Sequence, residues 1–229
     1  MFEIKITNLV KKYGKKPVLK INSLNFQEGE VVGIIGKNGS GKTTLAEVIL
    51  GTKSKTSGEI NYSIENLRKN AVFQETSFDD EVNLKHNYLF YKKLFDDQGK
   101  AKNKISQEDD FKKYGLTGLE KHKFSTLSGG QKQRFKIMIA MANNPQVILF
   151  DEVSNSLDLK TKKWFEETLA RKKTSGEAII FVISHDPAEL IKLCTRIIKI
   201  DQQEIVYDQE ILKNKLNEQK LARLMEDES

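Results

Sequence analysis

A glycine-rich segment of eight residues could hold a chain of phosphates: Gly36-Lys-Asn-Gly-Ser-Gly-Lys-Thr43. It matches the pattern G-x-x-x-x-G-K-[ST], in which glycines let the backbone curl so that its N–H groups point at the phosphates. Lys42 supplies a positive charge for the β- and γ-phosphates, and the Thr43 hydroxyl can ligate Mg²⁺. A glycine-rich turn without chemistry is the alternative. We expect the phosphates to contact Gly36, Lys37, Asn38, Gly39, Ser40, Gly41, Lys42, Thr43 and Thr44.

Two adjacent carboxylates form a second candidate site, Asp151 and Glu152, directly after the apolar run 147–150. A buried strand that ends in a carboxylate delivers it to the carboxyl edge of a parallel sheet, where ligands of such sheets bind. Asp151 could hold Mg²⁺ through its water shell. Glu152 could polarise a water for in-line attack on the γ-phosphate. Alone, such a pair can be a solvated strand end, but the phosphate-binding pattern upstream favours catalysis.

A third segment, Leu127-Ser-Gly-Gly-Gln131, opens a predicted helix. The backbone N–H groups, the Ser128 hydroxyl and the positive end of the helix would together make a second anion site. An ordinary serine N-cap followed by flexible glycines is the alternative. One chain therefore carries two features that could bind phosphate.

The elements that must position these residues follow from hydrophobic periodicity. Continuous apolar runs predict buried strands, alternation predicts a half-buried strand, and three- and four-residue spacings predict helices. The predicted strands cover residues 2–7, 31–35, 70–73, 147–150, 178–183, 196–200 and 204–207, the last two forming a hairpin. The predicted helices cover residues 42–51, 129–143, 159–172 and 211–225, and residues 81–113 are largely helical.

The order of these elements indicates a fold class. Continuous apolar strands separated by helices predict a parallel sheet with helices on both faces. The helical stretch between about residues 75 and 140 interrupts that alternation. We therefore predict an α/β fold in which a helical subdomain is inserted into the core.

Composition limits the classes of function. The chain has 229 residues and a formal net charge of +6, and its lysines are scattered along the sequence as on ordinary solvated faces. Direct nucleic-acid binding is therefore not expected. The single cysteine, Cys194, excludes an internal disulfide. No apolar run approaches the ~20 residues that a membrane-spanning helix needs, so we expect a cytoplasmic protein.

Together these motifs resemble the ABC ATPase family. Residues 127–131 match its signature in full, and their spacing to Asp151 and Glu152 fits. The resemblance runs from about residue 2 to about residue 207. It implies a P-loop NTPase (RecA-like) core of mainly parallel sheet, an N-terminal antiparallel β subdomain and an inserted α-helical subdomain.

The resemblance also implies a domain organisation. Residues 1–229 would form a single ABC ATPase domain. Its nucleotide-binding core would comprise residues 1–74 and 141–229, and residues 75–140 would be the helical subdomain that carries the signature.

Single residues receive roles from the same resemblance. It implies that Tyr13 stacks on the adenine, with packing in an edge sheet as the alternative. Gln74 would contact Mg²⁺ and the attacking water, and His185 would contact the γ-phosphate. The implied catalytic residues are Glu152, His185, Gln74 and Lys42, and the implied metal ligands are Thr43, Gln74 and Asp151.

One departure from the family is visible in the loop after the two carboxylates. Proline and threonine are usual there, and this chain has Val153 and Ser154. A proline ring would fix the backbone bend. Its absence leaves the course of the loop open but removes no reacting group.

In this family the signature of one subunit closes over the ATP held by another, and a loop at residues 154–158 would cross the interface. We therefore expect Ser128, Gly129, Gly130 and Gln131 to contact the ATP of a partner. That partner is a second ABC ATPase subunit, either a second copy or a paralogue. Hydrolysis would remove the γ-phosphate contact and open the pair.

The resemblance implies that ATP and Mg²⁺ drive transport through a separate transmembrane permease subunit, which would hold the chain at the inner face of the cell membrane. A soluble ABC-type ATPase acting on nucleic acid or ribosomes is the alternative, but such proteins usually carry two cassettes or a long coiled-coil insertion. The segment after Gln74 loosely resembles the ATPases of bacterial exporters, so export is expected.

The permease contact is expected in the same segment. A short helix of the permease would lie in a groove beside Gln74. Phe78, Val82, Leu84 and Tyr88 would line that groove. Phe78 is expected to be exposed, whereas Leu84 is expected to fill the core of the subdomain.

Overall fold

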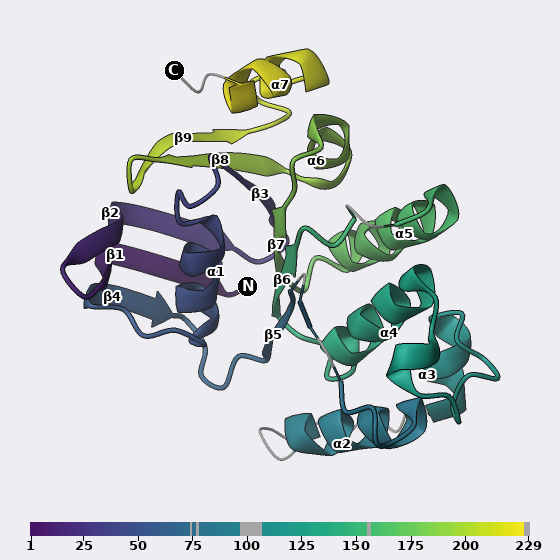
Figure 1. Ribbon diagram of the computed structural model, residues 1–229. Helices are drawn as coiled ribbons and strands as arrows, with labels where there is room; N and C mark the ends of the chain where they lie inside the picture. Colours follow the sequence, from purple (N-terminus) through teal and green to yellow (C-terminus); the bar gives the residue numbers. More distant parts are fainter. Residues whose placement is uncertain (74, 77, 97–106, 155–156, 227–229) are drawn as a thin grey trace.

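The computed structural model describes residues 1–73, 75–76, 78–96, 107–154 and 157–226 (Figure 1). The strands are β1 (Glu3–Tyr13), β2 (Lys16–Gln27), β3 (Val31–Ile35), β4 (Ser57–Tyr62), β5 (Lys69–Val72), β6 (Val147–Asp151), β7 (Ile179–Ile183), β8 (Arg196–Asp201) and β9 (Glu204–Glu210). The helices are α1 (Lys42–Leu50), α2 (Leu84–Asp96), α3 (Gln107–Lys113), the 3₁₀ helix η1 (Phe124–Thr126), α4 (Gly129–Met141), α5 (Leu159–Ser175), α6 (Pro187–Leu193) and α7 (Glu218–Glu226).

The strands form two sheets. One is antiparallel, in the order β2-β1-β4, and the other has six strands in the order β5-β6-β7-β3-β8-β9. Within the larger sheet only β9 pairs in the antiparallel direction, with β8. Helices α2, α3 and α4 lie between β5 and β6 in the sequence. The predicted fold class, with its antiparallel N-terminal sheet and helical insertion, is therefore confirmed.

Both faces of the six-stranded sheet are buried. Helix α1 lies between the two sheets, whereas α4, α5 and α6 cover the other face (Figure 1). The side chains of β3 alternate between two hydrophobic cores. Val32 and Ile34 pack with α1, and Val31 and Ile35 pack on the opposite face. Side chains of a strand alternate between faces, so a strand covered on both sides must be continuously apolar.

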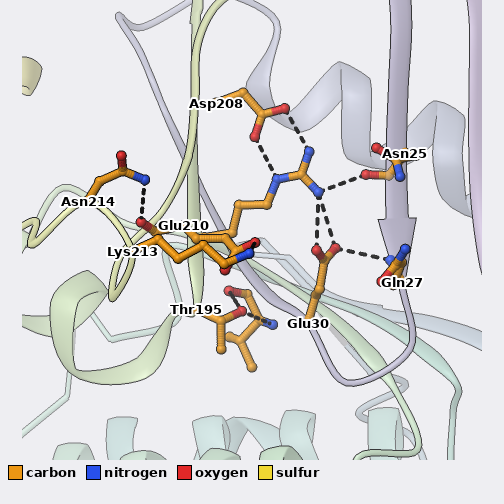
Figure 2. Close-up of polar contacts among 10 residues, drawn as sticks. Asn25, Gln27, Glu30, Thr195, Asp208, Glu210, Lys213 and Asn214 are labelled. Carbon is orange, nitrogen blue, oxygen red and sulfur yellow. Dashed lines mark hydrogen bonds and ion pairs between the residues drawn. The ribbon is translucent and has the colours of Figure 1, made fainter.

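A partly buried arginine, Arg196 of β8, joins β9 and β2 to Glu30, the residue that precedes β3 (Figure 2). Arg196 Nε and Nη2 donate to the two carboxylate oxygens of Asp208, each at 2.6 Å. Its Nη1 donates to the Asn25 carbonyl oxygen at 2.8 Å and to Glu30 at 3.2 Å. Bidentate, charge-assisted bonds of this kind are among the stronger polar contacts in proteins. They anchor the start of β3, the strand that leads to the glycine-rich loop.

Some boundaries differ from those predicted. Strands β2 and β4 and helix α6 had not been predicted as separate elements, and the described part of the stretch 81–113 contains two helices, α2 and α3. Helix α7 begins at Glu218 instead of residue 211. The reason is an N-cap: the Asn217 side chain accepts a hydrogen bond from the Lys220 N–H at 2.9 Å, which fixes the start of the helix.

Candidate nucleotide-binding site

The glycine-rich loop joins the end of β3 to the start of α1. Gly36, Gly39 and Gly41 all have positive φ angles, of 143°, 80° and 109°. A Cβ atom on Gly36 would collide with the Ile200 carbonyl oxygen, and one on Gly41 would lie 2.7 Å from a methyl group of Leu19. The tight turn therefore depends on glycine both for its backbone angles and for its close packing.

The interior of this loop fits an anion. Lys42 is buried, and its Nζ donates to the carbonyl oxygens of Gly36 at 2.8 Å and Lys37 at 3.0 Å. The buried Ser40 Oγ has no hydrogen-bond partner among the described residues. The N-terminus of α1 opens into the same loop. An ammonium group, an unsatisfied hydroxyl and a positive helix end together form a cradle suited to phosphate.

A cation position adjoins this cradle. The Thr43 hydroxyl donates to Asp151 Oδ2 at 2.8 Å, which joins α1 to the end of β6. Burial raises the pKa of the Asp151 carboxyl above its ordinary value, and the hydrogen bond from Thr43 opposes this shift. Hydroxyl and carboxylate oxygens are the ligands that Mg²⁺ prefers. The residues at this position therefore fit a magnesium ion.

Replacing Asp151 by asparagine should stabilise the metal-free protein. The raised pKa means that the folded state binds the proton more tightly than the unfolded state, so stability falls as the pH rises from about 4 through the folded pKa. We expect Asp151→Asn to raise the melting temperature at pH 7, and the difference to vanish below about pH 4, where the carboxyl is protonated in both states.

Thermal unfolding in EDTA tests this expectation. In MgATP the order should change, because the wild type gains stability from the bound ligand and Asp151→Asn gains less. A metal-free variant that melts below the wild type at pH 7 would contradict the argument.

A cavity of about 420 Å³ opens beside the loop. The Tyr13 ring stands at its edge, 46% exposed, with Lys11 Nζ 4.8 Å from the ring centroid. The lining residues are Tyr13, Lys16, Pro17, Val18, Lys37, Asn38, Gly39, Ser40, Asp201, Gln202 and Gln203. This volume lies within the range of small-molecule pockets. An exposed tyrosine next to a phosphate cradle is the arrangement expected of a residue that stacks on a base.

The sequence did not indicate that Asp201, Gln202 and Gln203 line this cavity. Asp201, Gln202 and Gln203 belong to the turn between β8 and β9, far from the glycine-rich loop in the sequence. Gln202 and Gln203 both have positive φ, as a two-residue hairpin turn requires. The hairpin itself was predicted, but only the pairing of β8 with β3 brings its turn to the loop.

The two residues predicted to act on water and on the γ-phosphate lie side by side. Glu152 Oε1 is 3.1 Å from His185 Nε2, although the two residues follow different strands. Glu152 has an unusual positive φ of 52°, and its N–H donates to the Ile183 carbonyl oxygen at 2.9 Å. Because β6 and β7 are adjacent and parallel, their carboxyl ends bring both side chains to one edge of the sheet.

The signature segment begins α4 at the surface. The Ser128 side chain accepts from the Gln131 N–H at 3.3 Å, and the Ser128 N–H donates to the Gln131 side chain at 2.9 Å. This is a capping box. Gly130 packs closely on the start of α5, since a Cβ there would lie 2.9 Å from Thr161 Oγ1. Helices α1 and α4 lie on opposite faces of the six-stranded sheet, so each chain presents the phosphate loop and the signature separately (Figure 1).

The loop after Glu152 is described in part. Gln74 and residues 155–156 lie outside the described residues. Val153 and Ser154 are buried, and Asp158 caps α5 by accepting from the Thr161 N–H at 2.7 Å.

The prediction that Phe78 is exposed is wrong. Its ring makes edge-to-face contacts with Tyr91, Phe124 and Phe135 at centroid distances of 5.5, 4.9 and 4.9 Å. Phe78 itself is partly buried, and Leu84 and Tyr88 are fully buried. A charge at position 78 would therefore disrupt an aromatic cluster that holds α2 on α4, and would report on folding instead of docking.

Other apolar side chains of α2 are exposed instead. Leu89, Phe90 and Leu94 are 43%, 64% and 45% exposed.

Among the described residues, no helix has both the length and the apolar character needed to cross a bilayer.

This chain is similar in sequence to proteins of known family. The family described as "ABC transporter" matches residues 19–155. The chain is 32% identical over 213 residues to the spermidine/putrescine import ATP-binding protein PotA of Mycoplasma mycoides, covering 88% of this chain and 60% of that protein. It is 29% identical over 221 residues to the tungstate uptake ATP-binding protein TupC of Peptoclostridium acidaminophilum, covering 89% of this chain and 96% of that protein.

A third relative is the sulfate/thiosulfate import ATP-binding protein CysA 2 of Rhizobium meliloti, 32% identical over 218 residues. This match covers 89% of the chain and 58% of the relative. The chain thus spans about 60% of the length of the PotA and CysA proteins.

Solved structures are similar as well. The dimeric structure of MJ0796, a bacterial ABC transporter cassette, matches with a TM-score of 0.77 at 28% identity, covering 91% of this chain and 98% of that one. The same cassette in a dimeric post-hydrolysis state bound to ADP and Pi matches with a TM-score of 0.76 at 27% identity and the same coverage.

Proposed function

Because this chain belongs to the ABC transporter family, we propose that it hydrolyses MgATP and passes the energy to a separate membrane permease. The observation that carries the proposal is the meeting of three groups at one edge of the six-stranded sheet. The phosphate cradle with Lys42 follows β3, the Thr43–Asp151 pair adjoins it, and the Glu152–His185 pair lies at the ends of β6 and β7.

Each group takes one role in the reaction. The loop N–H groups and Lys42 hold the phosphates, with Lys42 exchanging its carbonyl partners for phosphate oxygens. Thr43, Asp151 and Gln74 would hold Mg²⁺, which neutralises phosphate charge when bound. Glu152 accepts a proton from the water whose oxygen attacks the γ-phosphorus. The bond to ADP breaks as the new P–O bond forms, and His185 steadies the γ-phosphate beside Glu152.

The active unit is proposed to be a pair. Ser128, Gly129, Gly130 and Gln131 of one subunit would contact the ATP of the other, since the signature is exposed on the face opposite α1. Both MJ0796 structures are described as dimeric, one of them bound to ADP and Pi. The second subunit is either a copy of this chain or a paralogue.

We assign residues 1–74 and 141–229 to the nucleotide-binding core and residues 75–140 to the subdomain that meets the permease. The contact is placed on the exposed apolar side chains of α2, Leu89, Phe90 and Leu94. Binding there would hold the chain at the inner face of the membrane.

The direction of transport is proposed to be import. The sequence pattern after Gln74 had favoured export, and that prediction is not confirmed. PotA and CysA 2 are named import proteins, and TupC belongs to a named uptake system. These names give no support to the alternative of an ATPase acting on nucleic acid or ribosomes.

Reconstitution tests the direction. The chain and the permease that co-purifies with it would be placed in vesicles, with MgATP supplied only outside, so that only outward-facing cassettes are energised. An importer moves solute toward the cassette side and should empty vesicles preloaded with labelled spermidine, sulfate or tungstate. Accumulation of solute inside the vesicles would contradict import, and absence of ATP hydrolysis would contradict the proposed function itself.

The docking surface is tested by Phe90→Glu. Phe90 is 64% exposed, so the variant should fold and bind ATP like the wild type while losing co-purification with the permease and permease-stimulated hydrolysis. Val206→Glu is the matched control, because Val206 is 55% exposed on β9, outside the helical subdomain. If Phe90→Glu still assembles with the permease, the contact lies elsewhere.

A further inference from the structure

A buried carboxylate outside the proposed reaction joins two loops. Glu189 lies on α6 and is 2% exposed. Its Oε2 accepts a hydrogen bond from the Ser154 hydroxyl at 2.6 Å and another from the Ser184 hydroxyl at 2.5 Å. Both serines are themselves buried. The other carboxylate oxygen, Oε1, is buried and has no hydrogen-bond partner among the described residues.

The two serines belong to the segments that carry Glu152 and His185. Ser154 follows Glu152 by two residues, and Ser184 directly precedes His185. Glu152 and His185 lie 3.1 Å apart at their closest atoms. Glu189 therefore joins the two loops that carry Glu152 and His185.

The same junction is fixed to the helices around it. The Ser184 hydroxyl accepts from the Asp186 N–H at 3.1 Å, and Asp186 caps α6 through the N–H groups of Ala188 and Glu189. Lys162 of α5 forms an ion pair with Asp186 at 2.6 Å. Because α5 and α6 are both anchored, a shift of either serine would require breaking bonds to a rigid frame.

Stability alone does not favour this arrangement. A buried carboxylate oxygen without a partner costs free energy, and apolar replacements of buried polar groups are often neutral or stabilising. What an apolar side chain cannot do is accept two hydroxyl hydrogens on one oxygen and so fix two loops at a set separation. Val153 does not impose the backbone constraint that a proline would, and the Ser154 bond to Glu189 is one of the contacts that hold this loop, together with the Glu152 N–H bond to the Ile183 carbonyl oxygen.

We propose that Glu189 is a positioning residue that sets the separation of Glu152 and His185 by binding Ser154 and Ser184 together. The inference rests on the proposed ATPase function. Misplacing a reacting group by about 1 Å can lower a rate on the order of a hundredfold. The Glu189 carboxylate bonds to Ser154 and Ser184, whereas the contacts of Lys42 and Thr43 in the cradle involve other residues, so its loss should lower kcat and leave the KM for MgATP nearly unchanged.

The experiment measures kcat and KM for MgATP on the full chain. Glu189→Ala should lower kcat at least tenfold and change KM by less than about twofold. Ser154→Ala should also lower kcat, and Ser154→Thr, which keeps the hydroxyl, should retain more of it. Adding Ser154→Ala to Glu189→Ala should cause little further loss, because both changes remove the same contact.

The control is Thr168→Val. Thr168 is buried on α5, and its hydroxyl contacts residues of the same helix: it donates to the Trp164 carbonyl oxygen and accepts from Arg171 Nη2. It should lower stability without lowering kcat. If Glu189→Ala does not fold, the comparison of Ser154→Ala with Ser154→Thr decides the question by itself.

The outcomes separate this inference from the function on which it rests. A wild-type chain without ATP hydrolysis would overturn the proposed function. A wild type that hydrolyses ATP, together with Glu189→Ala or Ser154→Ala at the wild-type kcat, would overturn only the role of Glu189. A loss of kcat that merely follows the loss of thermal stability, as judged against Thr168→Val, would also overturn it.

Discussion

Glu152→Gln is expected to lower the rate of ATP hydrolysis at least a hundredfold while leaving ATP binding in place. A general base contributes on the order of 10²–10⁴ to a rate, and an amide has the shape of the carboxylate but cannot accept the proton. The side chain is about a quarter exposed, at 23%, and sits beside His185 without contributing to the phosphate cradle. Substrate binding should therefore survive.

The consequence should be visible in assembly as well as in turnover. ATP persists in the variant, so the nucleotide-bound pair should accumulate, and light scattering in MgATP should report more dimer than in the wild type. Glu166→Gln is the matched control, because Glu166 of α5 pairs with Lys192 of α6 at 2.6 Å and takes no part in the proposed reaction. Turnover of Glu152→Gln near the wild-type rate would remove Glu152 from its role.

Ser128→Arg is expected to abolish hydrolysis while preserving the ATP affinity of the isolated subunit. Ser128 is exposed at the N-terminus of α4, so an arginine there would add bulk and charge where the partner's ATP must fit. Equilibrium binding of MgATP and gel filtration measure the two properties separately. Ser128→Ala controls for the lost N-cap, which is worth about 1 kcal/mol.

Mixing two inactive subunits gives the sharpest form of this test. A pair made from Ser128→Arg and Lys42→Ala contains one intact phosphate loop facing one intact signature. If the site is shared between subunits, the mixture should regain part of the activity that neither variant shows alone. Collapse of ATP binding in the isolated Ser128→Arg subunit would instead place the signature in its own subunit's site.

The phosphate loop could be predicted from sequence because its requirements are local. Positive φ at three glycines and a lysine after the last of them are readable within eight residues. The contact between Glu152 and His185 could not be predicted in this way, because the two residues lie far apart in the sequence. It depends on the adjacency of β6 and β7, which periodicity does not specify, and the role inferred for Glu189 depends on the same pairing.

Other errors arose because hydrophobic periodicity alone is compatible with more than one structure. The aromatic residues of α2 and the segment before it showed a helical period, but the period does not tell which face is covered, so Phe78 was placed outside and Phe90 was not considered. In β2 the buried residues are Leu19 and Ile21, then Leu24 and Phe26. The alternation changes phase between the two pairs, and a strict search for period two misses such a strand.

The position of β3 in the larger sheet has a consequence for how the protein is made. Its two neighbours, β7 and β8, come from residues more than a hundred positions later in the chain. During synthesis the glycine-rich loop leaves the ribosome early, yet the strand that aims it has no partner until most of the chain has been translated. Nucleotide cannot stabilise the growing chain before that point. The chain therefore binds nucleotide late in folding, after β7 and β8 have been made and have paired with β3.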